Sequence, residues 1–242
     1  DGRREPNPAG SSTHMEAVVP YLLVALTLSA PPPAVPPVRA DYLIVFAGDH
    51  TPYRPTQAHT FAALVGVKTP PGGPPRVAEF HSISWLPETM NVRGLALRPE
   101  KGRNVPLDET LAYCLGPRGH VTAWGPYLVR PELAATFRAR VATVEGQFRY
   151  KGAAFTSPRD VCDCIRAVEE MGRSDRRYIG VFGYGAAAAS SAVRTLSPGL
   201  IDPHQTHPWV ADLVGLGAYP LVWRGYGEYT TKWDQFRAAR RW

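Results

Sequence analysis

Apolar residues of this chain fall into short runs in its first half and into helix-like patterns in its second half. Residues 41–47 form an almost unbroken apolar run, which is typical of a strand buried in a core. Residues 59–67 and 77–85 predict two more strands, and the Pro/Gly-rich residues 70–75 between them predict a hairpin loop. A further strand is predicted over residues 120–129.

Helical patterns predominate after residue 106. Helices are predicted over residues 107–115, from Pro131 to about residue 144, and over residues 186–193, with a short helix at 209–214. Residues 157–160, Ser-Pro-Arg-Asp, have the composition of a helix cap and predict a helix that contains Cys162 and Cys164 and ends near Gly172. Because the strands come mostly before the helices, the fold class is expected to be α+β.

The first 40 residues predict a leader without a fixed structure. Residues 15–40 resemble a secretory signal, since the apolar stretch 18–30 is short for a membrane span and Val38 and Ala40 suit a cleavage before Asp41. The alternative is that residues 18–30 form a short buried helix of the domain. The signal interpretation predicts a secreted, periplasmic or cell-envelope protein, with one domain over residues 41–242 and no membrane span after cleavage.

The composition excludes several classes of function. The chain has 242 residues and a net charge of +6, but its basic residues are scattered apart from Lys232, Arg237, Arg240 and Arg241 near the end, so a patch or motif for specific nucleic-acid binding is lacking. Gly183-x-Gly185 lacks the third glycine and the later acidic residue of a dinucleotide site. No zinc-ligand spacing occurs, and we therefore expect no cofactor and no metal.

The three cysteines provide the candidate chemistry. An odd number of cysteines in an exported protein leaves at least one free thiol. Cys164 follows Asp163 at the expected start of a helix, where unpaired N–H groups favour the nucleophilic thiolate. Cys114 and Cys162 are interpreted as core residues, and buried packing is the alternative for Cys164 as well.

Two histidines on the predicted hairpin are candidate partners for this thiol. His59 and His81 face each other if the hairpin is centred on Pro70, whereas a centre at Gly72 separates them and leaves Ser84 or a backbone carbonyl to orient His59. A structural role for His59 is the alternative. His204 and His207 form a rival pair of bases in a proline-flanked segment, where a loop motif or a surface metal pair is the other interpretation.

The segment from Tyr150 to Val168 resembles NlpC-type peptidases of the papain-like superfamily. It contains Tyr-Lys-Gly, Ser-Pro and Asp-Cys in the order of that family's Tyr-x-x-Gly-Gly, Ser-Pro and Asp-Cys-Ser-Gly motifs. It departs from them at the second glycine, which is alanine here, and at the Ser-Gly after the cysteine, which is Ile-Arg. The histidines precede the cysteine, an order similar to the circularly permuted, lecithin:retinol acyltransferase-like branch.

This resemblance implies an antiparallel sheet packed against helices, in a papain-like, NlpC-like and permuted arrangement. It implies that Cys164 is the nucleophile, His59 the base and His81 the orienting residue, and that Tyr150 lines the oxyanion site. The expected function is an exported cysteine hydrolase or acyltransferase that acts on an amide or ester bond, with a cell-wall peptide as the natural substrate. The alternative is a non-catalytic exported module that binds a peptide, glycan or lipid. The oligomeric state is left open.

Overall fold

The structure is a computed structural model, and it describes residues 38–52, 58–92, 98–152, 161–172 and 185–228. Contacts within the chain divide it into two units, Asp1–Ala34 and Val35–Trp242, and every described residue belongs to the second. The predicted leader up to residue 37 and the cap-like residues 157–160 lie outside the described residues. All the helices and strands of the structure are therefore parts of the second unit.

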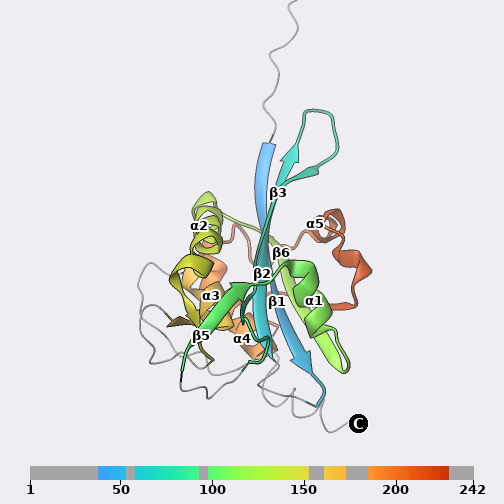
Figure 1. Cartoon of the computed structure of the whole chain (residues 1–242). Helices are drawn as coiled ribbons and strands as arrows, with labels where there is room; N and C mark the ends of the chain where they lie inside the picture. The colour runs from blue at the N-terminus through green and yellow to red at the C-terminus, as the bar shows by residue number, and fades with distance from the viewer. Residues whose placement is uncertain (1–37, 53–57, 93–97, 153–160, 173–184, 229–242) are drawn as a thin grey trace, which may run out of the picture. The chain divides into compact units, whose positions relative to one another are not determined.

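The larger sheet has five strands in the order β3-β2-β1-β6-β9 (Figure 1). They are β1 (Val38–His50), β2 (His59–Thr69), β3 (Arg76–Ile83), β6 (Gly119–Leu128) and β9 (Leu221–Arg224). The first four are antiparallel to one another, whereas β9 is parallel to β6. The long strand β1 is therefore the centre of the sheet and has a partner on each side.

Helices cover both faces of this sheet (Figure 1). The first face packs against α2 (Pro131–Gln147), α3 (Cys164–Glu169) and α4 (Ala186–Leu196). The second face packs against α1 (Leu107–Cys114), α5 (Pro208–Leu213) and the 3-10 helix Leu216–Ala218. Because β1 is buried on both faces, its sequence is continuously apolar instead of alternating.

A second, smaller sheet contributes to the core of the first face. Its strands are β4 (Trp85–Pro87), β5 (Glu100–Asn104), β7 (Arg149–Tyr150) and β8 (Val161–Cys162), in that order across the sheet. Its side chains Trp85, Leu86, Tyr150 and Cys162 belong to the same hydrophobic cluster as the helices of the first face. Two 3-10 turns, Glu170–Gly172 and Ser197–Gly199, come directly after α3 and α4.

A tight turn closes the β2–β3 hairpin. The N–H of Gly73 donates to the carbonyl of Pro70 over 3.1 Å, and Gly72 has a φ of 68°. Proline before a glycine with positive φ is the pattern of a type II turn, which fits Pro71 and Gly72. The predicted hairpin is confirmed, and the turn fixes a register that decides how its two histidines face.

The prediction of an α+β fold, with a largely antiparallel sheet packed against helices, is confirmed. The strands predicted at 41–47, 59–67 and 120–129 and the helices predicted at 107–115, 131–144, 186–193 and 209–214 are all present. The strand predicted at 77–85 is present only as far as Ile83, because Trp85 begins β4 in the second sheet. The strand β1 begins at Val38, so the residues proposed for signal cleavage, 38–40, pair with β2. The second sheet and β9 were not predicted.

Candidate functional site

Cys164 is the first residue of α3. Asp163 precedes it as the N-cap, and its carboxylate accepts the backbone N–H of Arg166 over 2.8 Å. The backbone N–H groups of Thr60, Cys164 and Ile165 hydrogen-bond to the sulfur and lower the pKa of the thiol. The thiol therefore lies at a helix start, as the sequence predicts, and it also contacts β2, a strand about 100 residues earlier in the chain.

Burial outweighs these hydrogen bonds at Cys164. The residue is only 6% exposed, and the resulting desolvation raises the pKa of its thiol to about 12, with the nearby Asp163 carboxylate adding to the effect. In this structure the group is a protonated thiol at neutral pH. The helix start does favour the thiolate, as the sequence predicts, but in this structure desolvation of the thiol has the larger effect.

A break in the strand pairing makes the Thr60 amide available. The β2–β3 register pairs Ala62 with Ile83, so Trp85 would lie opposite Thr60 if β3 continued. Trp85 instead begins β4 in the second sheet. At Thr60 the edge of β2 is therefore not paired with β3, and the sulfur of Cys164 bonds to the Thr60 amide instead.

His59 is fully buried on β2. Its ring stacks on Phe61 with a centroid distance of 5.3 Å, and its Nε2 lies 2.9 Å from Ser84 Oγ. Burial lowers the pKa of the imidazole to about 3, so the ring is neutral at physiological pH. The sequence alternative in which Ser84 holds His59 is confirmed.

The imidazole and the thiol approach β2 from different faces. Phe61 belongs to the core of the second face, and alternation along the strand puts His59 on that face. Helix α3 packs on the first face. Both groups nevertheless reach the same edge of β2, the sulfur through the Thr60 amide and the ring through Ser84.

His81 does not pair with His59. It lies opposite Leu64, a core residue of the first face, so its side chain projects on that face while His59 projects on the second. Its Nε2 contacts the carboxylate of Glu79. The register that would bring the two histidines together is wrong, and the structure gives no support to His81 as the orienting residue.

Glu79 is the centre of an ion-pair network beside His81. Its carboxylate accepts Arg138 Nε over 2.8 Å and also contacts Arg39, while Arg138 Nη2 bonds to Asp41 over 2.7 Å. The hydrogen bond from Arg138, with that from His81, lowers the pKa of Glu79 to about 2. The network ties β1 and β3 to α2, which gives His81 a structural role.

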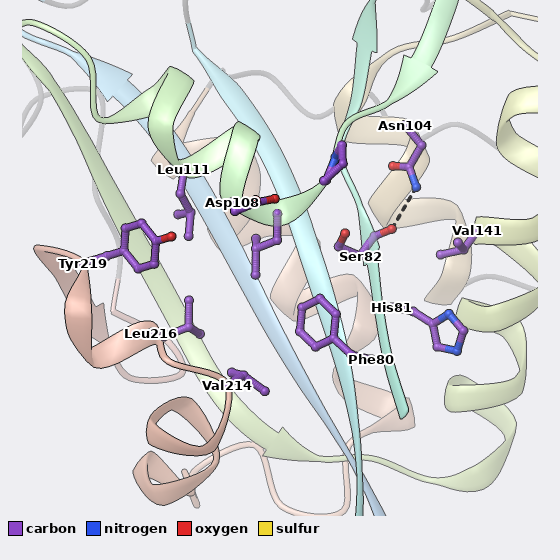
Figure 2. Close-up of a pocket in the computed structure, with 12 residues that line it drawn as sticks. Phe80, His81, Ser82, Asn104, Asp108, Leu111, Val141, Val214, Leu216 and Tyr219 are labelled. Carbon is purple, nitrogen blue, oxygen red and sulfur yellow. Dashed lines mark hydrogen bonds between the residues drawn. The ribbon is translucent and has the colours of Figure 1, made fainter. Parts of the chain in front are cut away.

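His81 also lines a groove of about 520 Å³ beside the edge strand β3 (Figure 2). Apolar side chains from β3, α1 and the segment after α5 form most of its wall, among them Phe80, Leu107, Leu111 and Leu216. Asn104 closes one end, since its amide donates to the Ser82 carbonyl over 2.9 Å. Neither Cys164 nor His59 is among the described residues that line this groove.

Tyr150 is buried in the core of the first face. Burial raises the pKa of its hydroxyl well above the usual value, and Cys164 is the largest electrostatic contributor to that rise. Tyr150 is the β7 partner of Cys162, two residues before Cys164 in the chain. An oxyanion role for Tyr150 stays a prediction.

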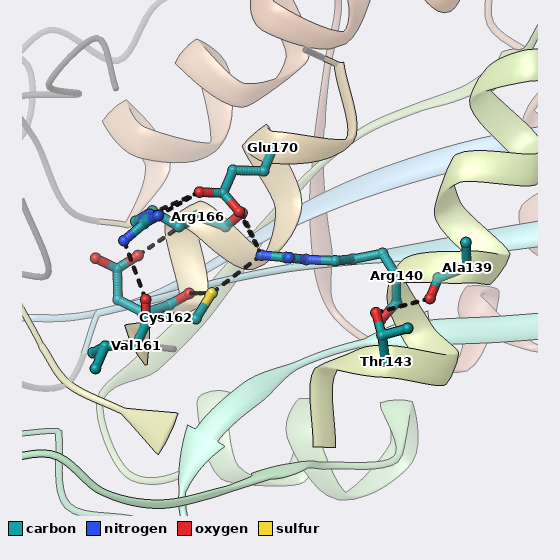
Figure 3. A network of polar contacts seen from close by, with 8 residues as sticks. Ala139, Arg140, Thr143, Val161, Cys162, Arg166 and Glu170 are labelled. Carbon is teal, nitrogen blue, oxygen red and sulfur yellow. Dashed lines mark hydrogen bonds and ion pairs between the residues drawn. The ribbon is translucent and has the colours of Figure 1, made fainter. Parts of the chain in front are cut away.

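Cys162 lies on β8 and not on the helix of Cys164, which corrects the predicted helix start. Arg140 from α2 reaches it, with Nη2 3.3 Å from the sulfur, and the same guanidinium bonds to Glu170 over 2.8 Å (Figure 3). Arg166 from α3 bonds to Glu170 over 2.6 Å. Burial raises the pKa of the Cys162 thiol, and its interpretation as a core residue is confirmed.

Cys114 is buried at the end of α1, as predicted. Its sulfur packs on Gly48, where an added Cβ would lie 2.4 Å from it, and Gly48 is the β1 partner of His59. Burial raises the pKa of this thiol too, with Cys164 as the second cause. Cys114 is therefore a packing residue close to the candidate site.

The rival histidines are placed by aromatic contacts. His207 meets Tyr42 edge-on at a centroid distance of 5.1 Å, and His204 meets Tyr226 in the same way. Within the described ranges, no group of three or more His, Cys, Asp and Glu side chains is arranged to hold a metal ion. The two histidines lie before α5, separate from Cys164 in the sequence and in their contacts.

Sequence reasoning missed Thr110, which contacts Ser84 from α1. Its Oγ1 lies 2.7 Å from Ser84 Oγ and 2.9 Å from the carbonyl of Pro106. The available signal was a threonine on the apolar side of a helix, next to Leu111. A buried hydroxyl in that position needs partners, and here it finds Ser84.

Comparisons with known proteins give no relative for this arrangement. The chain matches no protein-family model, no curated protein and no solved structure. Among the helices that the structure describes, none has the length and apolar character that a membrane crossing requires.

Proposed function

We propose that the protein is a cysteine hydrolase or acyltransferase that acts on an amide or ester bond, with Cys164 as nucleophile and His59 as base. The observation that carries this proposal is that both groups make contacts at the same edge of β2, although they lie on different faces of the strand. The sulfur bonds to the amide of Thr60, the residue directly after His59, and Ser84 holds the imidazole at the same edge. The Nδ1 atom of His59 is buried and has no partner among the described residues.

The protonation states suit the start of such a reaction. The thiol carries its proton and the imidazole is neutral, so His59 can accept the proton as the sulfur attacks the carbonyl carbon. The thiol–carbonyl adduct collapses to a thioester and releases the amine or alcohol, which takes the proton from His59. Water or an acceptor amine then cleaves the thioester and frees the thiol.

Substrate entry has to relieve the burial of both groups. Desolvation opposes the charged thiolate and the charged imidazolium, so the proton transfer becomes favourable only when water or polar substrate atoms reach the edge of β2. This predicts slow reaction of the free protein with small thiol reagents and faster reaction with an acyl substrate. The proposal includes the permuted NlpC-like arrangement, export and a cell-wall peptide as substrate.

Thiol-directed acyl probes test this function. We expect a peptide thioester or activated ester to acylate the wild type at one cysteine, identified by peptide mass mapping. The variants C114A and C162A should be acylated as the wild type is, and C164A should not. Acylation that survives in C164A, or its complete absence with peptide and ester probes in the wild type, would contradict the proposal.

A non-catalytic binding module is the second candidate function. It is favoured by the burial of Cys164 and by the apolar groove of Figure 2, in which Phe80 is 39% exposed. This candidate predicts that acyl probes leave the thiols untouched while a peptide, glycan or lipid ligand shifts the NMR signals of groove residues. The acylation experiment therefore separates the two functions.

A further inference from the structure

A chain of hydroxyl groups links His59 to a backbone carbonyl. His59 Nε2 lies 2.9 Å from Ser84 Oγ, Ser84 Oγ lies 2.7 Å from Thr110 Oγ1, and Thr110 Oγ1 lies 2.9 Å from the carbonyl of Pro106. All of these side chains are buried, and they come from β2, the β3–β4 junction and α1. The chain therefore runs through the interior of the second face.

The last member of the chain fixes its direction. A carbonyl oxygen only accepts hydrogen bonds, so the contact with Pro106 uses the single proton of the Thr110 hydroxyl. The 2.7 Å contact with Ser84 by itself also suits Thr110 as the donor, but the Thr110 proton is used for Pro106. Thr110 Oγ1 is then the acceptor toward Ser84, and the Ser84 proton is used in that bond. The remaining contact, between Ser84 and His59, is a hydrogen bond only if the proton lies on Nε2.

The opposite direction satisfies fewer groups. If Thr110 donated to Ser84 and Ser84 donated to Nε2, two oxygens would meet at 2.9 Å without a proton between Thr110 and Pro106. The imidazole proton would then be on Nδ1, which is buried and has no partner among the described residues. A buried N–H without an acceptor is the rarer and costlier arrangement in proteins.

We propose that Ser84 and Thr110 form a positioning relay that holds the proton of His59 on Nε2 and leaves Nδ1 as the basic nitrogen. The catalytic use of Nδ1 rests on the proposed function, in which Nδ1 is the atom that takes the proton from the Cys164 thiol. Thr110 touches neither His59 nor Cys164 in this role, and it acts through the orientation of the Ser84 hydroxyl. The relay itself requires no catalysis.

NMR of the uniformly ¹⁵N-labelled protein tests the relay directly. Long-range ¹H–¹⁵N correlation shows which ring nitrogen of a neutral histidine carries the proton, and His59 is identified by its contact with the Phe61 ring. The wild type and T110S should carry the proton on Nε2. In T110V, which lacks the hydroxyl, Ser84 is free to donate to Nε2, and the proton should move to Nδ1.

The outcomes separate the relay from the catalytic function. A wild type with the proton on Nδ1, or a T110V protein with an unchanged tautomer, overturns the relay. The expected tautomers in a protein that no acyl probe modifies would support the relay and overturn the catalytic function. If T110V does not fold, the spectra of the wild type and T110S still decide the tautomer.

Kinetics give a second readout when acylation is observed. T110V should lower kcat by at least about tenfold with little change in KM, since the wrong tautomer of a catalytic histidine costs up to about 10⁴-fold in rate. T110S, which retains the hydroxyl, should restore most of the rate. A purely structural role would lower the stability of both variants without this split between kcat and KM.

Discussion

Asp49 Oδ2 accepts a hydrogen bond from the backbone N–H of Ala186 over 2.9 Å, although the two residues are 137 positions apart in the chain. The bond joins the end of β1 to the first turn of α4. Gly185 makes it possible, because its φ is 58° and an added Cβ would lie 1.7 Å from Asp49 Oδ1. Burial raises the pKa of Asp49 to about 7, despite this hydrogen bond.

The raised pKa of Asp49 predicts a pH-dependent loss of stability. The folded protein holds the Asp49 proton more tightly than the unfolded chain, so the free energy of unfolding should fall as pH rises from about 4 to 7. The change is up to about 4 kcal/mol. In D49N, which keeps an acceptor oxygen, this contribution should be absent, whereas the exposed control D212N should follow the wild type.

Urea unfolding at several pH values between 4.5 and 7.5 measures this difference. The comparison with D49N is necessary because the lowered pKa of His59 acts in the opposite direction, raising stability as pH rises from about 3 to 6.5. A constant difference in stability between D49N and the wild type over this range would contradict the prediction.

The Glu79 network predicts a loss of stability in acid. The pKa of Glu79 is lowered to about 2, so its contribution is present above pH 4.5 and is lost as pH falls toward 2. Since the side chain is 27% exposed, E79Q should cost about 1 kcal/mol at pH 7 and flatten the acid side of the stability curve. Chemical unfolding at pH 7 and pH 3 measures both effects.

The exposed ion pair between Glu88 and Lys101 provides the control for this network. Its N–O distance is 2.8 Å, but the side chains are 54% and 76% exposed, so E88Q should change stability less than E79Q. Equal effects of the two substitutions would show that the Glu79 network contributes no more than an ordinary surface pair.

Two glycine substitutions should have opposite effects on stability. An added Cβ at Gly102 would lie 2.2 Å from the Trp85 ring, and overpacking of this kind costs about 1–3 kcal/mol. Gly146 lies exposed in α2 with nothing near its Cβ position, so G146A should stabilise the protein by about 0.5–1 kcal/mol. Thermal unfolding should show a lower Tm for G102A and a higher one for G146A.

Arg140 in α2 is expected to contribute more to stability than Arg130, an exposed arginine directly before the same helix. Its guanidinium contacts the Cys162 sulfur, the Arg166 carbonyl and Glu170 together, which a lysine ammonium cannot reproduce. R140K should lower the free energy of unfolding by about 1.5–3 kcal/mol. R130K, at an exposed position before α2, should have an effect near zero in the same urea titration.

Most of the fold could be predicted because the longer elements have clear local patterns. The apolar run of β1, the turn at Pro71-Gly72 and the proline at the start of α2 each identify an element without distant information. The strands of the second sheet could not be found in this way. Strands of two or three residues, such as β7 and β8, are too short to show a period.

The candidate site was harder to predict because it depends on register and burial. A change of one residue in hairpin register moves every side chain of a strand to the other face of the sheet. A hairpin centred on Pro70 would pair His59 with His81, whereas the observed register pairs His81 with Leu64 and leaves the two histidines on opposite faces. The raised pKa of Cys164 depends on strands and helices that cover it from distant parts of the chain. Neither property is encoded in the residues next to the cysteine.

The parallel pairing of β9 with β6 has a consequence for how the chain is made. Residues 38–83 can form three antiparallel strands as soon as they leave the ribosome, whereas the edge of β6 waits until Leu221–Arg224 has been synthesised. An open strand edge is a template for association with other chains. Truncated or stalled nascent chains that lack β9 should therefore be the forms most prone to aggregate and to recruit chaperones.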